Sequence, residues 1–186
     1  MTKAVLIGGG NLAFHFYRKL TNCNKVNLIQ WYSRSLQKID FAKKKIEITD
    51  KFSQIKSADL YLICASDAAI RSICKKINTT ELVVHCAGGV SIDQLKGTSR
   101  KGVFYPLQTF SKNQDLSFDQ IPFCIETTDP KDQILLSNLA KAMGGIPHKI
   151  NGKTRTKIHM IAVLINNFGN HLLHLGSKLS KEHGIP

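Results

Sequence analysis

A short apolar run that leads directly into three glycines is the feature that most constrains this chain. Residues 4–7 read as a buried strand, and the next six, Gly8-Gly9-Gly10-Asn11-Leu12-Ala13, fit the pattern G-x-G-x-x-A. In a strand–turn–helix unit, Gly8 permits the tight turn, Gly10 permits close approach to a ligand, and Ala13 is small enough for helix and strand to pack. The first N–H groups of the helix are free to bind an anion. The pattern predicts a pyrophosphate site, with a flexible glycine turn as the alternative.

Strand and helix patterns alternate along most of the chain. Strands are expected at 4–7, 26–32, 46–48, 59–64, 82–85, 102–105, 122–126 and 146–150, and helices at 12–20, 36–44, 67–77 and 129–143. The run 59–64 is almost continuously apolar, as expected of a parallel strand that is buried on both faces. Such alternation predicts an α/β fold with a doubly wound, mostly parallel sheet and right-handed crossovers.

The last segment, from about residue 153 to 181, differs in kind because it reads as one long helix. It contains no proline, and its apolar residues recur at steps of three and four, so that they share one face: Ile158, Ile161, Ile165, Phe168, Leu172, Leu175 and Leu179. A helix of this length spans roughly 40 Å, too long to lie wholly on a small domain. We therefore expect the apolar face to associate with a partner, in a homodimer formed through this helix.

Composition limits the broad class of the protein. The 186 residues, 42% of them hydrophobic, suffice for one substantial core. We expect a cytoplasmic protein without a targeting signal or membrane contact, because Met1-Thr2-Lys3 leads straight into a strand and no run approaches a membrane span. Five widely spaced cysteines without a C-x-x-C pair predict reduced thiols and no metal site.

The net charge of +13 admits nucleic acid, a membrane surface or an anionic small ligand as partner. The lysine clusters at 43–45 and 75–76 are not interleaved with aromatic residues, which a groove for single-stranded nucleic acid needs. No helix-turn-helix or zinc-finger pattern is present. We therefore expect solvated helix faces and an attraction for phosphate ligands, and no nucleic-acid partner.

The residues after the second strand select the cofactor. Enzymes that hold NAD place an Asp or Glu at the end of this strand, whereas NADP enzymes replace it with small polar residues and an arginine. Here the chain reads Ser33-Arg34-Ser35, without an acid. Arg34 offers a planar, permanently charged fork, and the two serines can donate to phosphate oxygens. The segment therefore predicts NADP, the alternative being an arginine in a solvent-exposed turn.

Two later strand ends should line the nicotinamide half, since ligands of open α/β sheets bind beyond the carboxyl ends of the strands. Ala65, Ser66 and Asp67 follow one strand, and His85, Cys86 and Ala87 follow the next. The small Ala65 and Ala87 leave room for the cofactor. For Ser66 or Asp67 the alternative is a helix cap, and for His85 a structural role.

The long helix carries a polar stripe opposite its apolar face. His159, Asn166 and Asn170 lie nearly in line, flanked by Asn167 and His174. Hydride transfer to or from a C=O or C=N bond needs a proton donor or acceptor and hydrogen bonds that fix the substrate, which a histidine with neighbouring amides can provide. An ordinary wet helix face is the alternative.

Six segments together resemble a known family: Gly8 to Ala13, Ser33-Arg34-Ser35, Ser66-Asp67-Ala68-Ala69-Ile70, His85-Cys86-Ala87-Gly88, Tyr105-Pro106-Leu107-Gln108-Thr109-Phe110 and His159 with Asn167-Phe168. The chain resembles Rossmann-like NADP oxidoreductases with a C-terminal domain of unknown function (domain of unknown function 2520). These are similar in plan to pyrroline-5-carboxylate reductase and the 6-phosphogluconate dehydrogenase superfamily. The resemblance covers essentially the whole chain.

The resemblance implies a Rossmann-like NADP-binding domain over 1–151, followed by an all-helical dimerisation and substrate domain. Residues 152–186 would be the first long helix of that domain, here truncated or incomplete. Gly8, Gly10, Asn11, Leu12, Ser33 and Arg34 match the cofactor motif, and His159 and Asn167 match the helix that faces the nicotinamide. The chain departs from the pattern at Tyr105, where many relatives have His, and in the spacing of Lys153 and Lys157 on the long helix.

Taken together, the sequence predicts an NADP-dependent oxidoreductase that moves a hydride between nicotinamide and a small carbonyl or imine substrate. His159 is the candidate for proton transfer, with Asn167 orienting the substrate. A non-catalytic NADP-binding module that senses redox state or organises a partner is the alternative. A nucleic-acid binder is a third hypothesis, for which affinity would depend steeply on salt.

Overall fold

A single sheet forms the body of the molecule in the computed structural model, which describes residues 1–112, 114 and 116–185. Within these residues, eight strands follow the order β3-β2-β1-β4-β5-β6-β7-β8. They are β1 (Thr2–Ile7), β2 (Val26–Tyr32), β3 (Glu47–Thr49), β4 (Leu60–Ile63), β5 (Leu82–His85), β6 (Lys101–Pro106), β7 (Pro122–Thr127) and β8 (Ile146–Lys149). All neighbours pair in parallel except β6 and β7. The first six strands have the dinucleotide-binding order, in which strands are added outward from β1 on one side and from β4 on the other, so that the strand order switches between β1 and β4.

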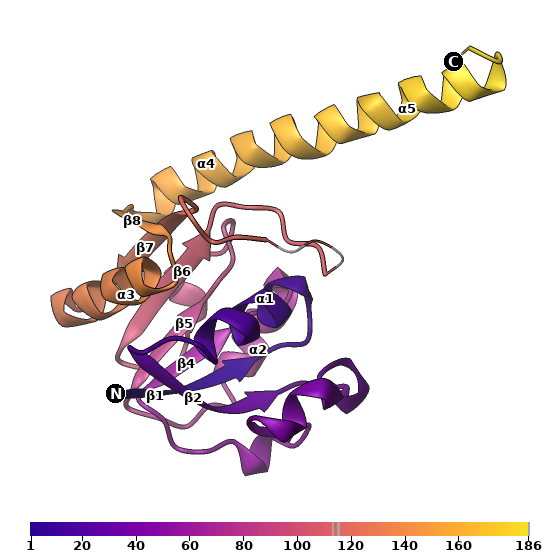
Figure 1. Cartoon of the computed structure of the whole chain (residues 1–186). Coiled ribbons are helices and arrows are strands. Elements are labelled where there is room, and N and C mark those ends of the chain that lie inside the picture. Colours follow the sequence, from indigo (N-terminus) through magenta and orange to yellow (C-terminus); the bar gives the residue numbers. More distant parts are fainter. Residues whose placement is uncertain (113, 115, 186) are drawn as a thin grey trace.

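Helices cover both faces of this sheet (Figure 1). They are α1 (Asn11–Leu20), α2 (Asp67–Cys74) and α3 (Pro130–Ala142), with short 3₁₀ turns η1 (Leu36–Lys38), η2 (Asp40–Lys44), η3 (Phe52–Gln54) and η4 (Ile92–Gln94). Strand residues alternate between two cores. Ala4 and Leu6 of β1 pack in one cluster with α1 and α3, while Val5 and Ile7 pack in the other with α2. The α/β fold with a mostly parallel sheet is confirmed.

The prediction of one helix over 36–44 is wrong. The segment forms the two 3₁₀ turns η1 and η2, because Ile39 between them adopts φ −128° and ψ 5° and interrupts the helix. The side chain of Ile39 is fully buried, so that packing holds this break in place.

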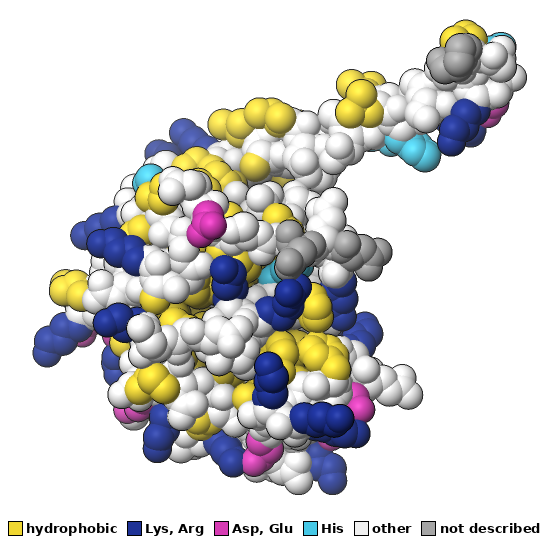
Figure 2. Space-filling view, in the orientation of Figure 1, with side chains coloured by type: hydrophobic (Ala, Val, Ile, Leu, Met, Phe, Trp, Pro, Cys, Tyr) yellow, Lys and Arg dark blue, Asp and Glu magenta, His cyan; other side chains and the backbone are white. Residues whose placement is uncertain are grey.

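The C-terminal helix is continuous and projects from the end of the sheet that carries β7 and β8 (Figure 1). It consists of α4 (Gly152–Val163), a π-helical turn η5 (Leu164–Phe168) and α5 (Gly169–Glu182). Pro186, the last residue of the expected segment 152–186, lies outside the described residues. Hydrophobic side chains stand out on the projecting part in Figure 2. The exposed ones include Ile161, Leu164, Ile165, Phe168, Leu172, Leu173, Leu175 and Leu179.

None of the described helices combines the length and the apolar character that crossing a bilayer requires.

Candidate functional site

The glycine turn between β1 and α1 is enforced by the neighbouring strand. Gly8 has φ +137°, and a Cβ atom placed there would lie 2.0 Å from the Cys64 carbonyl oxygen. The Trp31 indole donates to the Gly8 carbonyl at 2.6 Å and fixes the turn from the other side. A Cβ at Gly10, by contrast, would meet no atom within 4 Å. Gly8 therefore serves the fold, whereas the bare backbone of Gly10 faces open space.

A cavity of about 700 Å³ opens at this turn, between the carboxyl ends of β1 and β4. Nine of the predicted cofactor residues line it: Gly8, Gly10, Asn11, Leu12, Ser33, Arg34, Ser35, Ala65 and Ser66. The α1 N-terminus at its wall has Gly10 as N-cap and no side-chain cap, which leaves backbone N–H groups available to an anion. The cavity lies at the switch point of the sheet, where this fold binds ligands.

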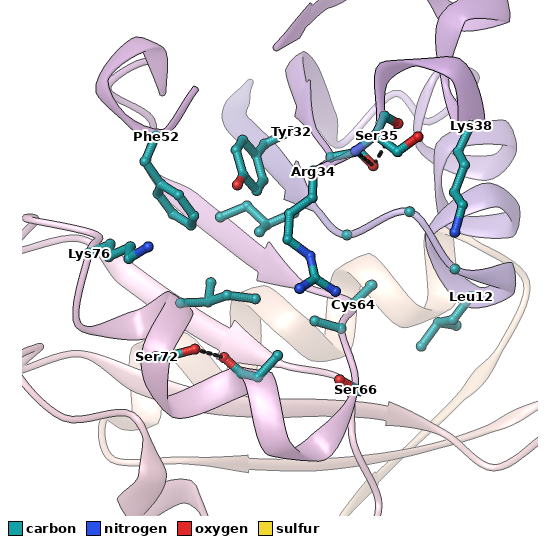
Figure 3. Close-up of a pocket in the computed structure, with 18 of the residues that line it drawn as sticks. Leu12, Tyr32, Arg34, Ser35, Lys38, Phe52, Cys64, Ser66, Ser72 and Lys76 are labelled. Atoms are coloured by element: carbon teal, nitrogen blue, oxygen red, sulfur yellow. Dashed lines mark hydrogen bonds between the residues drawn. The ribbon is translucent and has the colours of Figure 1, made fainter. Parts of the chain in front are cut away.

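Three cationic side chains border the cavity: Arg34, Lys38 and Lys76. In Figure 3 the Arg34 guanidinium points into the cavity, and Lys38 and Lys76 stand at opposite sides of it. Arg34 makes no hydrogen bond or ion pair within the described part of the chain. Lys76 lies over the Phe52 ring at 5.1 Å. Lys38, Phe52 and Lys76 were not predicted, because they follow no phosphate-binding motif and only the fold brings them here.

Ser33, the serine before Arg34, uses its hydroxyl within the turn. Ser33 is buried, and its hydroxyl donates to the Ser35 carbonyl at 3.1 Å while accepting from the Ser35 N–H at 3.3 Å. Its hydrogen is therefore engaged in the turn and is not free for a phosphate oxygen. Ser33 shapes the loop that presents Arg34, a role that the sequence did not predict.

The other three predicted cofactor residues, Asp67, His85 and Ala87, do not line this cavity. The His85 side chain is fully buried, and its Nδ1 accepts the Ala87 N–H at 3.2 Å. Burial, followed by the nearby Arg155 charge, lowers the pKa of His85 to about 4, so that the ring is neutral at pH 7. His85 thus shapes the loop after β5 from inside.

A second group of polar side chains gathers where α4 crosses that loop. The Tyr105 hydroxyl of β6 lies 3.0 Å from Nδ1 of His159, and the two rings meet edge to face. Gly88 lies directly against the pair, since a Cβ there would be 2.6 Å from both His159 Nδ1 and Tyr105 Cζ. Burial, then Cys124 and Asp67, raises the pKa of Tyr105 to about 12. Its phenol therefore keeps its proton at neutral pH.

Arg155, one turn before His159, holds this region together. Its side chain is 0% exposed and forms an ion pair with Glu126 of β7. It also donates to the Gly88 carbonyl at 3.2 Å and to the Val90 carbonyl at 2.5 Å. The other Glu126 oxygen accepts the Gly152 N–H at 3.0 Å, at the positive end of α4. Arg155 was not predicted, because a lone arginine at a helix start gives no sequence signal of burial.

The segment after β6 joins the two parts of the site. Asn11 at the glycine turn donates to the Phe110 carbonyl at 2.9 Å, and Asn166 of the long helix donates to the Thr109 hydroxyl at 2.9 Å. The predicted Asn167 is exposed, and its oxygen accepts from Asn166 at 3.3 Å. The helix therefore presents His159 and Asn166 to the Rossmann-like body, and Asn167 is exposed beside Asn166.

These features fit a phosphorylated dinucleotide. The open space at Gly10, the free N–H groups of α1 and three cations supply what pyrophosphate and an additional phosphate require.

Cys64 also lines the cavity. Burial holds the pKa of its thiol well above the ordinary value, so that Cys64 is no nucleophile.

Comparison with known proteins agrees with this architecture. Residues 121–186 match a domain of unknown function, DUF2520, in a stretch that includes β7, α3 and β8 as well as the long helix. No functionally curated protein matches the sequence.

Solved structures give the wider relationship. A putative NADP oxidoreductase from Bacteroides fragilis is 32% identical, with a TM-score of 0.89 over 100% of this chain and 74% of that one. A Thermotoga maritima protein is 21% identical, with a TM-score of 0.74 over 98% and 71% of the two chains. A pyrroline-5-carboxylate reductase from Coxiella burnetii is 22% identical, with a TM-score of 0.67 over 98% and 70%. The last two show the fold alone, whereas the first shows the family. This chain belongs to the Rossmann-like NADP oxidoreductase family that carries the domain of unknown function DUF2520.

Proposed function

We propose that this protein is an NADP-dependent oxidoreductase that acts on a small carbonyl or imine substrate. The observation that carries the proposal is the cavity at the glycine turn: Arg34, which has no partner among the described residues, is directed into it in place of an acidic residue. A carboxylate at this position would bond the ribose hydroxyls of NAD, whereas a guanidinium suits the 2′-phosphate of NADP. The relatives described as NADP oxidoreductase and pyrroline-5-carboxylate reductase support the same class of reaction.

Each part of the site has a role in this proposal. The α1 N-terminus and Gly10 bind the pyrophosphate through backbone groups, while Arg34 and Lys38 bind the additional phosphate. When bound, the nicotinamide supplies or takes up the hydride. His159 forms a hydrogen bond to the reacting oxygen or nitrogen of the substrate and takes part in proton transfer, and Asn166 and Asn167 orient the substrate.

The cofactor assignment is tested by fluorescence titration of NADPH and NADH. Arg34→Ala should weaken NADPH binding by roughly tenfold or more and leave NADH nearly unchanged, because only NADPH carries the phosphate that pairs with the guanidinium. Arg71→Ala is the matched control, since it removes the same charge from α2 outside the cavity wall. Equal losses for both cofactors would contradict the role of Arg34.

Turnover is tested by screening carbonyl and imine compounds for NADPH oxidation. Activity that disappears in His159→Gln while NADPH binding persists would support the assignment of His159. Tight NADPH binding without turnover of any compound class would favour the alternative, a redox-sensing or partner-organising module.

The proposal includes a homodimer formed through the long helix. The apolar residues exposed along η5 and α5 form a row that a partner copy would cover. Sedimentation should show a concentration-dependent dimer that Leu172→Glu weakens. A monomer at all accessible concentrations would contradict it.

A further inference from the structure

We infer that Tyr105 is a positioning residue for His159: its hydroxyl donates to Nδ1, and the imidazole therefore carries its hydrogen on Nε2 and presents an N–H to the bound substrate. The placement of the hydrogen is a property of the protein alone. Its meaning for the substrate rests on the proposed function.

The contact between the two side chains is built into the fold. Tyr105 is on β6 and His159 on α4, 54 positions apart, and their polar atoms lie 3.0 Å from each other. The backbone of Gly88 packs directly against both rings, and a side chain at this position would clash with them. Arg155 holds the Gly88 carbonyl, so that the loop, the strand and the helix are fixed relative to one another. Neither ring can move away without breaking this packing.

The direction of the hydrogen bond follows from the groups available. Among the described residues, the Tyr105 hydroxyl has no hydrogen-bond partner except His159. If Nδ1 donated, the phenolic hydrogen would have no protein acceptor in this half-buried position, at the cost of an unsatisfied donor. A neutral imidazole has one donor and one acceptor nitrogen, so that a hydrogen bond received at Nδ1 places the hydrogen on Nε2.

The surroundings of Nε2 favour the same arrangement. A Cβ at Gly89 would lie 3.7 Å from His159 Nε2 and 3.8 Å from an oxygen of Asp67, at the start of α2. The bare Gly89 therefore leaves Nε2 and a carboxylate facing the same small space. A nearby negative charge stabilises an N–H and disfavours a bare nitrogen lone pair. The charge of the neighbouring Arg155 is already paired with Glu126.

This arrangement decides what His159 does to a substrate. An imidazole with hydrogen on Nε2 donates to an acceptor atom, which is the oxygen of a carbonyl or the nitrogen of an imine. It thereby stabilises the charge that develops there as hydride arrives at carbon, as neutral histidines do in other enzymes. It does not act as a base toward a substrate hydroxyl in this form. The arrangement thus assigns to His159 the stabilisation of the developing charge by hydrogen-bond donation.

The test is a long-range ¹H–¹⁵N spectrum of the full chain labelled with ¹⁵N-histidine, recorded at about pH 8.5, where an ordinary histidine with a pKa of roughly 6.5 is neutral. His159→Gln identifies the His159 signals. His85 is an internal reference, because the N–H of Ala87 forces its hydrogen onto Nε2. We expect the same pattern for His159, and in Tyr105→Phe a shift of both its nitrogens toward the average of the two tautomers.

Tyr61→Phe is the matched control. It also removes a tyrosine hydroxyl with backbone hydrogen bonds, to Lys56 and Ala58, away from the site. It should leave the His159 signals in place. Hydrogen on Nδ1 of His159 in the wild type, or an unchanged spectrum in a folded Tyr105→Phe, overturns the inference. If Tyr105→Phe does not fold, the wild-type spectrum alone decides.

The outcome does not depend on the proposed function, because the spectrum is recorded without cofactor or substrate. If the protein binds no NADPH but His159 carries Nε2–H and responds to Tyr105→Phe, the Tyr105–His159 inference stands and the proposed function is contradicted. If the protein reduces a substrate with NADPH but His159 carries Nδ1–H, the proposed function stands and the inference is contradicted.

Discussion

The two halves of the site are built by different means. The phosphate half, named for the ligand that we propose for it, consists of backbone at the glycine turn and of cationic side chains at the rim of an open cavity. The half around His159 consists of side chains from β6, β7, α4 and the loop after β5, locked together by the buried Arg155. Backbone sites tolerate changes except where a Cβ meets a neighbour. A side-chain site depends on each of its buried contacts, so that the two halves should respond differently to substitution.

The largest effect is expected at Arg155. Arg155→Met should lower the free energy of unfolding by about 3–5 kcal/mol, because Glu126 and two loop carbonyls lose a buried partner. Urea denaturation measures this. Where the variant is folded, NADPH affinity should remain within about twofold, since Arg155 does not line the cavity. A stability equal to that of the wild type would show that the His159 half is not held by this ion pair.

The next effect concerns the one rigid point of the phosphate half. Gly8→Ala should destabilise the fold by roughly 3 kcal/mol, because its φ of +137° strains an L-residue and its Cβ meets the Cys64 carbonyl. Thermal and urea unfolding provide the measurement. A variant as stable as the wild type would mean that the turn relaxes without cost and that Gly8 serves the ligand alone.

The His159 half should also respond to acid. Burial lowers the pKa of His85 from 6.5 to about 4. Between these values the unfolded chain binds a proton that the folded chain does not, so that stability is complete above pH 6.5 and falls as the pH decreases. This contributes about 2 kcal/mol between pH 7 and pH 5. His85→Asn should show a flatter dependence in urea unfolding at the two pH values. Equal acid sensitivity would contradict the role of His85.

The smallest effect is expected at Gly10. Gly10→Ala should fold normally, because its Cβ meets no atom within 4 Å, yet bind NADPH about tenfold more weakly, a cost near 1.4 kcal/mol. The methyl group would occupy the space where the backbone approaches the pyrophosphate. Fluorescence titration measures it. Unchanged affinity would place the pyrophosphate elsewhere, and Gly8→Ala supplies the contrasting case of a folding defect.

The local parts of the site were predictable because their signals are short in sequence. The turn at Gly8 to Ala13 and the acid-free segment at Arg34 are contiguous motifs, and the periodicity of β4 and α4 shows in any window of the chain. The interruption at Ile39 and the π-helical turn at η5 were missed. The first depends on the packing of the buried Ile39 side chain, whereas the π-helical turn contains no buried residue and has no sequence motif that marks it.

The sequence by itself determined the sheet, the glycine turn and the charge that faces the cavity, because each arises from neighbouring residues and from the strand and helix periods. Only the tertiary structure decided that Tyr105 meets His159, that the buried Arg155 donates to the Gly88 carbonyl and that Asn166 donates to the Thr109 hydroxyl. These contacts join residues more than 50 positions apart, and their formation depends on packing against a shared loop. No local sequence pattern indicates contacts between such distant residues. For this reason nine residues that line the cavity were predicted from the sequence, whereas the contact between Tyr105 and His159 was not.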